Sequence, residues 1–137
     1  MKSVILVLAM ASLVGCASKQ EGPPAPPKPS VWFVAPVDGA TVGEEFNVVF
    51  GLIGKTIHPA GEIVEGTGHH HLIVDGGAVQ KGLVVPANKT HIHFGKGQTD
   101  TSLKLSKGKH VLTLQFADGA HQSFGEEMSA SITVNVQ

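Results

Sequence analysis

Apolar and polar residues alternate along several short segments of the chain after residue 30. Segment 46–52 reads FNVVFGL, in which every second residue is large and apolar, and segments 110–117 and 128–136 show the same pattern. A period of two is typical of strands that bury one face and leave the other in water. No segment has a clear helical period, so the pattern predicts an all-β protein.

Turn residues separate these segments. Asp38-Gly39 and Lys107-Gly108 are typical turn pairs, and the glycine-rich segment 51–68, which contains Pro59, is predicted to be a long loop. About seven short strands separated in this way predict a single antiparallel β-sandwich of the immunoglobulin-like type, with a small barrel as the alternative. The predicted strands are 31–34, 46–52, 69–74, 90–94, 101–105, 110–117 and 128–136.

The N-terminal segment has a different character. Residues 4–14 form an apolar run that is shorter than the roughly 20 residues needed to span a bilayer, which is typical of a signal-peptide core. The run leads into LVGC, which resembles the lipobox of bacterial lipoproteins. That resemblance implies cleavage after residue 15 and lipidation of Cys16, the only cysteine in the chain. In that family a residue such as Ala17 after the cysteine favours the outer membrane.

Residues 16–30 carry five of the eight prolines and almost no bulky apolar side chains. Such a segment is predicted to be an extended tether that could reach roughly 40 Å from the lipid. We therefore divide the chain into a signal peptide (1–15), a lipidated cysteine and tether (16–30) and one folded domain (31–137). The predicted location is the cell envelope, with the lipid in the outer membrane and the domain facing the periplasm.

The charge of the chain excludes one class of partner. The formal net charge is −1, there is no arginine, and the lysines are scattered. Nucleic-acid-binding surfaces normally carry a basic patch, so a nucleic acid is not an expected partner.

Two histidine pairs with H-x-H spacing are the main candidates for a site. His69 and His71 are one pair, and His91 and His93 are the other. Because side chains two residues apart share a face of a strand, each pair can direct two imidazoles to one ion. Four imidazoles suit copper or zinc, whereas calcium prefers oxygen ligands. His121 is a further candidate ligand, and His58 is a weaker one.

The remaining histidines are predicted to be structural. His70 lies between the two residues of the first pair and faces the opposite side of the strand. If Leu72 and Val74 are in the core, His70 is on the core side; if Ile73 is in the core, the assignment is reversed. His110 shares its face with Leu112, and a single inward histidine usually makes structural hydrogen bonds.

Several motifs occur together in one order: APVDGATV, GHHHLIVD, HIHFGKGQT, GKHVLTLQFADGAH and SASITVNV. In combination they resemble a bacterial family described as domain of unknown function 4399. The resemblance implies a small exported domain, often lipid-anchored, and it assigns no activity. The residues that carry over are Gln98, an accessory polar residue, and the motif histidines His69, His70, His71, His91, His93, His110 and His121.

Three functional hypotheses follow from the sequence. In the first, the domain is an envelope lipoprotein that binds copper or zinc as a carrier, buffer or sensor. In the second, it is a non-enzymatic binding or structural module whose histidines form a hydrogen-bond network. In the third, it is a metal-dependent enzyme with Asp75 or Asp100 as the base. The sequence contains no hydrolase or phosphate-binding motif, so we predict that it is not an enzyme and assign no catalytic residue.

Overall fold

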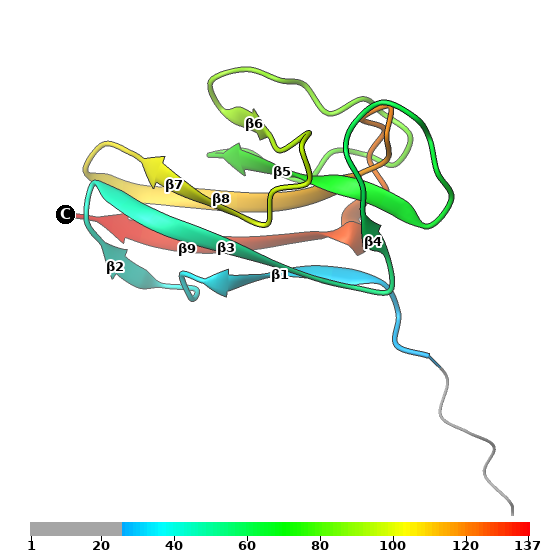
Figure 1. The fold of residues 1–137 in the computed structure, drawn as a ribbon. Helices are drawn as coiled ribbons and strands as arrows, with labels where there is room; N and C mark the ends of the chain where they lie inside the picture. Colours follow the sequence, from blue (N-terminus) through cyan, green and yellow to red (C-terminus); the bar gives the residue numbers. More distant parts are fainter. Residues whose placement is uncertain (1–25) are drawn as a thin grey trace, which may run out of the picture.

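The computed structural model describes residues 26–137, which form two packed β-sheets and one short 3-10 helix (Figure 1). The all-β sandwich is therefore confirmed. It has nine strands rather than about seven, because two short strands lie in segments that we predicted as a turn and a loop. The strands are β1 (Ser30–Ala35), β2 (Ala40–Val42), β3 (Glu45–Ile53), β4 (Thr56–Ile57), β5 (Thr67–Val74), β6 (His91–His93), β7 (Asp100–Lys104), β8 (Gly108–Ala117) and β9 (Ser129–Val136), and the helix η1 is Glu126–Met128.

The first sheet has the order β1-β3-β7, and both pairings are antiparallel. The second sheet has the order β2-β9-β8-β5-β4, and β6 also pairs with β5. The orders β1-β3-β7 and β9-β8-β5 follow the A-B-E and G-F-C orders of immunoglobulin-like sandwiches. The short strands β2 and β4 make parallel pairs with β9 and β5.

The hydrophobic core lies between the two sheets. Phe50 of β3 and Phe116 of β8 are among its largest members. Leu72 and Val74 of β5 belong to this core, which places His70 on the core side of the strand. The sequence left open whether Leu72 and Val74 or Ile73 faces the core. The structure confirms the first assignment, in which His70 is on the core side. The other buried core residues are Val31, Val48, Phe94, Leu103, Leu112, Leu114, Met128, Val134 and Val136.

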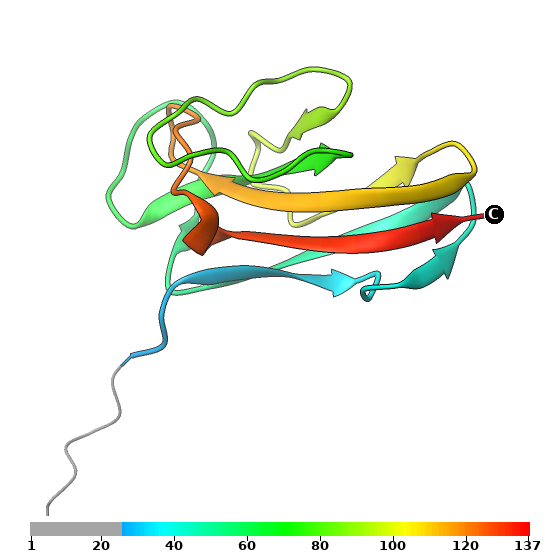
Figure 2. The ribbon, with the colours of Figure 1, turned by 180° about the vertical axis from the view of Figure 1, so that it is seen from behind.

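β5 is buried on both faces, from Gly68 to Val74. Its second face is covered by three loops: the loop between β4 and β5, the loop between β5 and β6, and the loop between β8 and η1. These loops gather at one corner of the sandwich in both views (Figures 1 and 2). Backbone hydrogen bonds tie these loops together: Gly61 N donates to Gly119 O, and Ser123 N donates to Leu83 O. His69 and His71 face this covered side and are fully buried. Sequence alternation correctly placed His69 and His71 on one face and His70 on the other, but it left open which face is the core and did not reveal the loops.

The predicted signal peptide, the lipidation site Cys16 and most of the tether lie outside the described residues. Residues 26–137 contain no helix that is both long and apolar enough to cross a membrane.

Candidate metal centre

Four imidazole rings meet on the covered face of β5. His69 and His71 come from β5, His93 from β6, and His121 from the loop that follows β8. Ring centroids are 4.8 Å apart for His69 and His71, 4.9 Å for His69 and His93, and 4.6 Å for His93 and His121. We call these four residues the histidine cluster.

The strand register brings three of these rings together. His71 on β5 is directly opposite His93 on β6, and His69 lies two residues earlier on the same face of β5. One potential ligand atom from each of these three residues lies within 4.8 Å of the others. Gly95 keeps the space beside His93 open, because a Cβ there would lie 2.2 Å from the His93 ring.

The fourth ring depends on a tight turn. Asp118 Oδ1 accepts hydrogen bonds from the backbone N–H groups of Ala120 and Gln122, and His121 N donates to Asp118 O. His121 has φ +68°, a left-handed conformation that is uncommon outside glycine. Val85 N donates to His121 O and fixes this conformation from a second loop. Local strain of this kind is often found where a side chain must be aimed at a functional site.

The cluster leaves buried nitrogens without partners. His71 Nε2 and His69 Nε2 are 3.0 Å apart, so in the metal-free chain one ring donates its N–H to the other. His69 Nδ1, His71 Nδ1 and His93 Nε2 have no hydrogen-bond partner among the described residues. A buried polar atom without a partner costs about 1–3 kcal/mol, so this arrangement is unfavourable unless something binds there.

The protonation state of the cluster also suits a metal. Burial, followed by the nearby His93 and His121, lowers the pKa of His69 to about 4, and Asp118 partly offsets this effect. Burial, followed by the neighbouring histidines, lowers the pKa of His71 to about 3. The pKa of His93 is lowered by burial and by His121. These rings are therefore neutral at pH 7, which is the form that binds copper or zinc.

The structure does not bring His91 into the cluster. His91 is opposite Ile73, one step of two residues (roughly 6.6 Å) further along the strand pair than His93. Its Nδ1 lies 3.2 Å from Asn88 Oδ1 and 3.1 Å from Thr90 Oγ1. The H-x-H pair on β6 thus supplies only the His93 ring to the cluster. The fourth ring is that of the loop residue His121 rather than that of His91.

His70 lies in the core and faces away from the cluster. Its ring centroid is 5.1 Å from the rings of both Phe50 and Phe116. Neither ring nitrogen has a hydrogen-bond partner among the described residues. His70 is therefore packed as a core residue, but it makes none of the hydrogen bonds that a histidine network would require.

Two other polar candidates make local contacts. His58 Nδ1 donates to Pro59 O at 3.0 Å. Gln98 Oε1 accepts a hydrogen bond from Lys96 N and so stabilises the turn after β6. Neither contact involves the histidine cluster.

His110 forms an ion pair at the opposite end of β8 from His121. Its Nδ1 donates to Asp75 Oδ2 at 2.8 Å, and its Nε2 donates to Ser106 O at 2.9 Å. Because both partners are acceptors, both ring nitrogens carry a proton and the imidazole is charged. The hydrogen bond to Asp75 raises the pKa of His110 despite partial burial. For Asp75, burial alone would raise the pKa, but the hydrogen bonds from His110 and Val111 N lower it overall.

We expect this ion pair to make stability depend on pH. The raised pKa of His110 stabilises the fold fully below 6.5, the value in the unfolded chain, and this contribution is lost as the pH rises through the folded pKa. The lowered pKa of Asp75 adds a contribution that is present above 3.8 and is lost at lower pH. Because the Asp75 carboxylate is half-exposed, the effect should be below about 1 kcal/mol.

The measurement is urea unfolding of the metal-free wild type and of His110→Gln at pH 6 and pH 9. The wild type should be more stable than the variant at pH 6, and the difference should shrink at pH 9. Comparing the two proteins at each pH cancels the contributions of the other histidines. An equal difference at both pH values would show that the charge of His110 does not stabilise the fold.

Two features of the site were not predicted from the sequence. One is the role of Asp118 in building the turn under His121, for which the sequence signal was the Asp-Gly pair in FADGAH. The other is the close approach of Gly119 to Glu62, where a Cβ would lie 1.9 Å from Glu62 O. Only glycine permits this contact between two of the three loops that cover the cluster.

The fold and the cluster together define a class: a β-sandwich domain with four clustered histidines at one corner, of which His69 and His71 are fully buried and His93 and His121 are partly buried. The chain belongs to the family described as "Domain of unknown function (DUF4399)", whose profile matches residues 48–137, and the resemblance noted in the sequence is thereby confirmed. No curated protein and no solved structure matches the chain.

Proposed function

We propose that this protein is an envelope lipoprotein whose histidine cluster binds one copper or zinc ion, as a carrier, buffer or sensor. The observation that carries the proposal is the convergence of four imidazoles, three of which (His69, His71 and His93) each have a buried ring nitrogen without a hydrogen-bond partner among the described residues. Three rings come from rigid strands and one from a tightly held turn. Imidazole suits copper and zinc, and four nitrogen ligands can complete a tetrahedral site.

The same observation favours metal binding over a purely structural role. In a hydrogen-bond network each ring would donate one hydrogen bond and accept another. The described residues contain a single hydrogen bond within the cluster, between His69 and His71. A bound ion would instead use the lone pairs of several rings at once.

The proposed anchoring rests on the sequence. The LVGC motif ending at Cys16 and the proline-rich segment after it support a lipid anchor and a tether. The lipid anchor would attach the protein to the membrane. The tether would connect that anchor to the folded domain, which contains the metal site. A location in the outer membrane, facing the periplasm, is part of the same proposal.

The test is a direct measurement of metal binding. All core residues lie between Val31 and Val136, so residues 17–137 retain the complete core and can be produced without a polyhistidine tag. We expect equilibrium dialysis to give one equivalent of Cu²⁺ or Zn²⁺ with a Kd below about 10 µM. At 100 times the Kd, the ion should stabilise the fold by about 2.7 kcal/mol.

Calcium and magnesium are the matched control ions, because they prefer oxygen ligands and should not raise the melting temperature. The proposal fails if neither copper nor zinc binds more tightly than about 10 µM to protein that is shown to be folded.

A further inference from the structure

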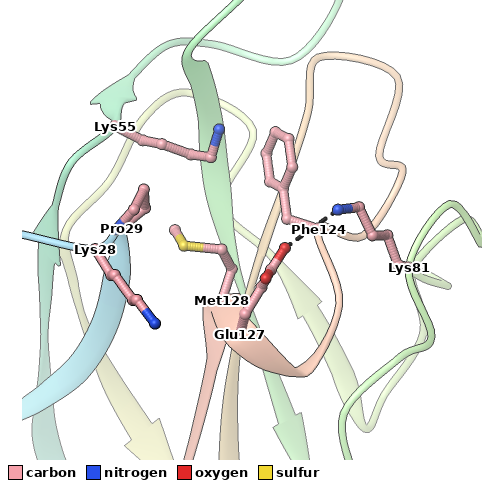
Figure 3. Close-up of a pocket in the computed structure, with 7 residues that line it drawn as sticks. All are labelled: Lys28, Pro29, Lys55, Lys81, Phe124, Glu127 and Met128. Atoms are coloured by element: carbon pink, nitrogen blue, oxygen red, sulfur yellow. Dashed lines mark hydrogen bonds and ion pairs between the residues drawn. The ribbon is translucent and has the colours of Figure 1, made fainter.

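A second candidate site lies where the tether enters the sandwich. A pocket of about 730 Å³ opens there, within the usual size range of small-molecule sites. Its walls come from four segments: the end of the tether, the turn between β3 and β4, the loop between β5 and β6, and the region around η1 (Figure 3). We call it the lysine pocket, and its lining residues are Lys28, Pro29, Lys55, Lys81, Phe124, Glu127 and Met128.

Close backbone contacts hold these segments together. Gly54 has φ +76°, and a Cβ there would lie 2.8 Å from Pro29 Cα, so the tether packs directly on the β3–β4 turn. Gly125 has φ +92°, and a Cβ there would lie 3.0 Å from Lys81 Cβ. These two contacts bring lysines from distant parts of the sequence to one pocket.

The pocket combines positive charge with an apolar floor. Lys81 Nζ is paired with Glu127 at 3.2 Å, whereas Lys28 and Lys55 have no acidic partner within the described part of the chain. Lys55 Nζ lies 4.0 Å from the centroid of the Phe124 ring, a cation–π contact that holds its charge at the pocket. Met128 lies between the lysines in Figure 3, and Phe124 and Pro29 extend the apolar surface.

We propose that the lysine pocket binds a small organic anion with an apolar body, such as an aromatic carboxylate. The two unpaired lysines would hold the charged group, and the side chains of Phe124 and Pro29, above the buried Met128, would hold the body. The pocket has three lysines and one glutamate, so an anion is favoured over a cation. This proposal is independent of the metal site, since no residue of the histidine cluster lines the pocket.

The probe is 2-naphthoate, and 2-naphthamide is the matched neutral ligand. The protein is residues 17–137 without metal, and binding is followed by the NMR shifts of the Phe124 and Gly125 amides. The buffer contains no phosphate and no chelator, because these anions could compete for the pocket. We expect saturable binding of naphthoate with a Kd near or below about 1 mM, and binding of naphthamide at least about tenfold weaker.

Two double variants complete the test. Lys28→Gln with Lys55→Gln should weaken naphthoate binding about tenfold and leave naphthamide binding unchanged. Lys104→Gln with Lys109→Gln removes the same charge from exposed positions on β7 and β8 and should have little effect on either ligand. The proposal is overturned if naphthoate does not saturate below about 5 mM, if the two ligands bind equally well, or if both double variants weaken binding equally.

Discussion

Replacing His93 with asparagine is expected to weaken the affinity for copper or zinc by about 100-fold or more. Loss of a residue that only supports a metal ligand typically costs 10–100-fold, so loss of a ligand should cost at least as much. His93 is the best member of the histidine cluster to change. It is only partly buried, and its Nε2 has no hydrogen-bond partner among residues 26–137 that its loss would disturb.

The matched control is His91→Asn on the same short strand. His91 has the same chemistry and lies two residues away, but its ring contacts Asn88 and Thr90 rather than the cluster. We expect the affinity of the His91→Asn variant for metal to stay within about threefold of the wild-type affinity. This corresponds to a change of less than about 1 kcal/mol in the free energy of binding. Equilibrium dialysis gives the affinities, and melting of the metal-free proteins shows whether both variants fold like the wild type.

Two outcomes would contradict the assignment. If both variants lost affinity equally, the ion would be held by the H-x-H pair of β6 and the strand would have to rearrange on binding. If neither variant lost affinity, the metal would be bound outside the cluster. In either case the arrangement of His69, His71, His93 and His121 would not be the metal site.

The comparison of His91 with His93 also shows what the sequence could predict. Alternation correctly placed residues two apart on one face, as for Leu72 and Val74 in the core. It could not predict the register between β5 and β6, and that register decides which histidine of the second pair faces His71. With His93 opposite His71, the strand geometry carries His91 away from the cluster.

The loops account for most of what could not be predicted. β2 and β4 have only three and two residues, too few for a periodic pattern. Likewise, His121 is brought to the cluster by a turn around Asp118, and its position depends on hydrogen bonds to a distant loop rather than on a repeating pattern. The sequence identified His121 as a candidate by its residue type, and only the fold shows why its ring lies beside His93.

His70 gives the second large expected effect, this time on stability. His70→Leu should raise the free energy of unfolding of the metal-free domain by about 1–2 kcal/mol at pH 7, because leucine removes two buried nitrogens that lack hydrogen-bond partners in the described structure. Leucine also retains most of the apolar contact with Phe50 and Phe116. His70→Ala is the control for lost packing, and it should lower the same free energy by about 2–4 kcal/mol because it leaves a cavity.

The advantage of leucine should grow in acid. Burial, together with the neighbouring His69, lowers the pKa of His70 from 6.5 to about 4. Because the unfolded chain takes up the proton first, the wild type loses stability as the pH falls from 6.5 towards 4, by roughly 3 kcal/mol for this residue. His70→Leu removes that loss, so urea unfolding at pH 7 and pH 5 should show a larger difference at pH 5. If leucine instead destabilised the domain at both pH values, the His70 ring would be making net favourable contacts with the faces of Phe50 and Phe116. The histidine itself would then stabilise the core.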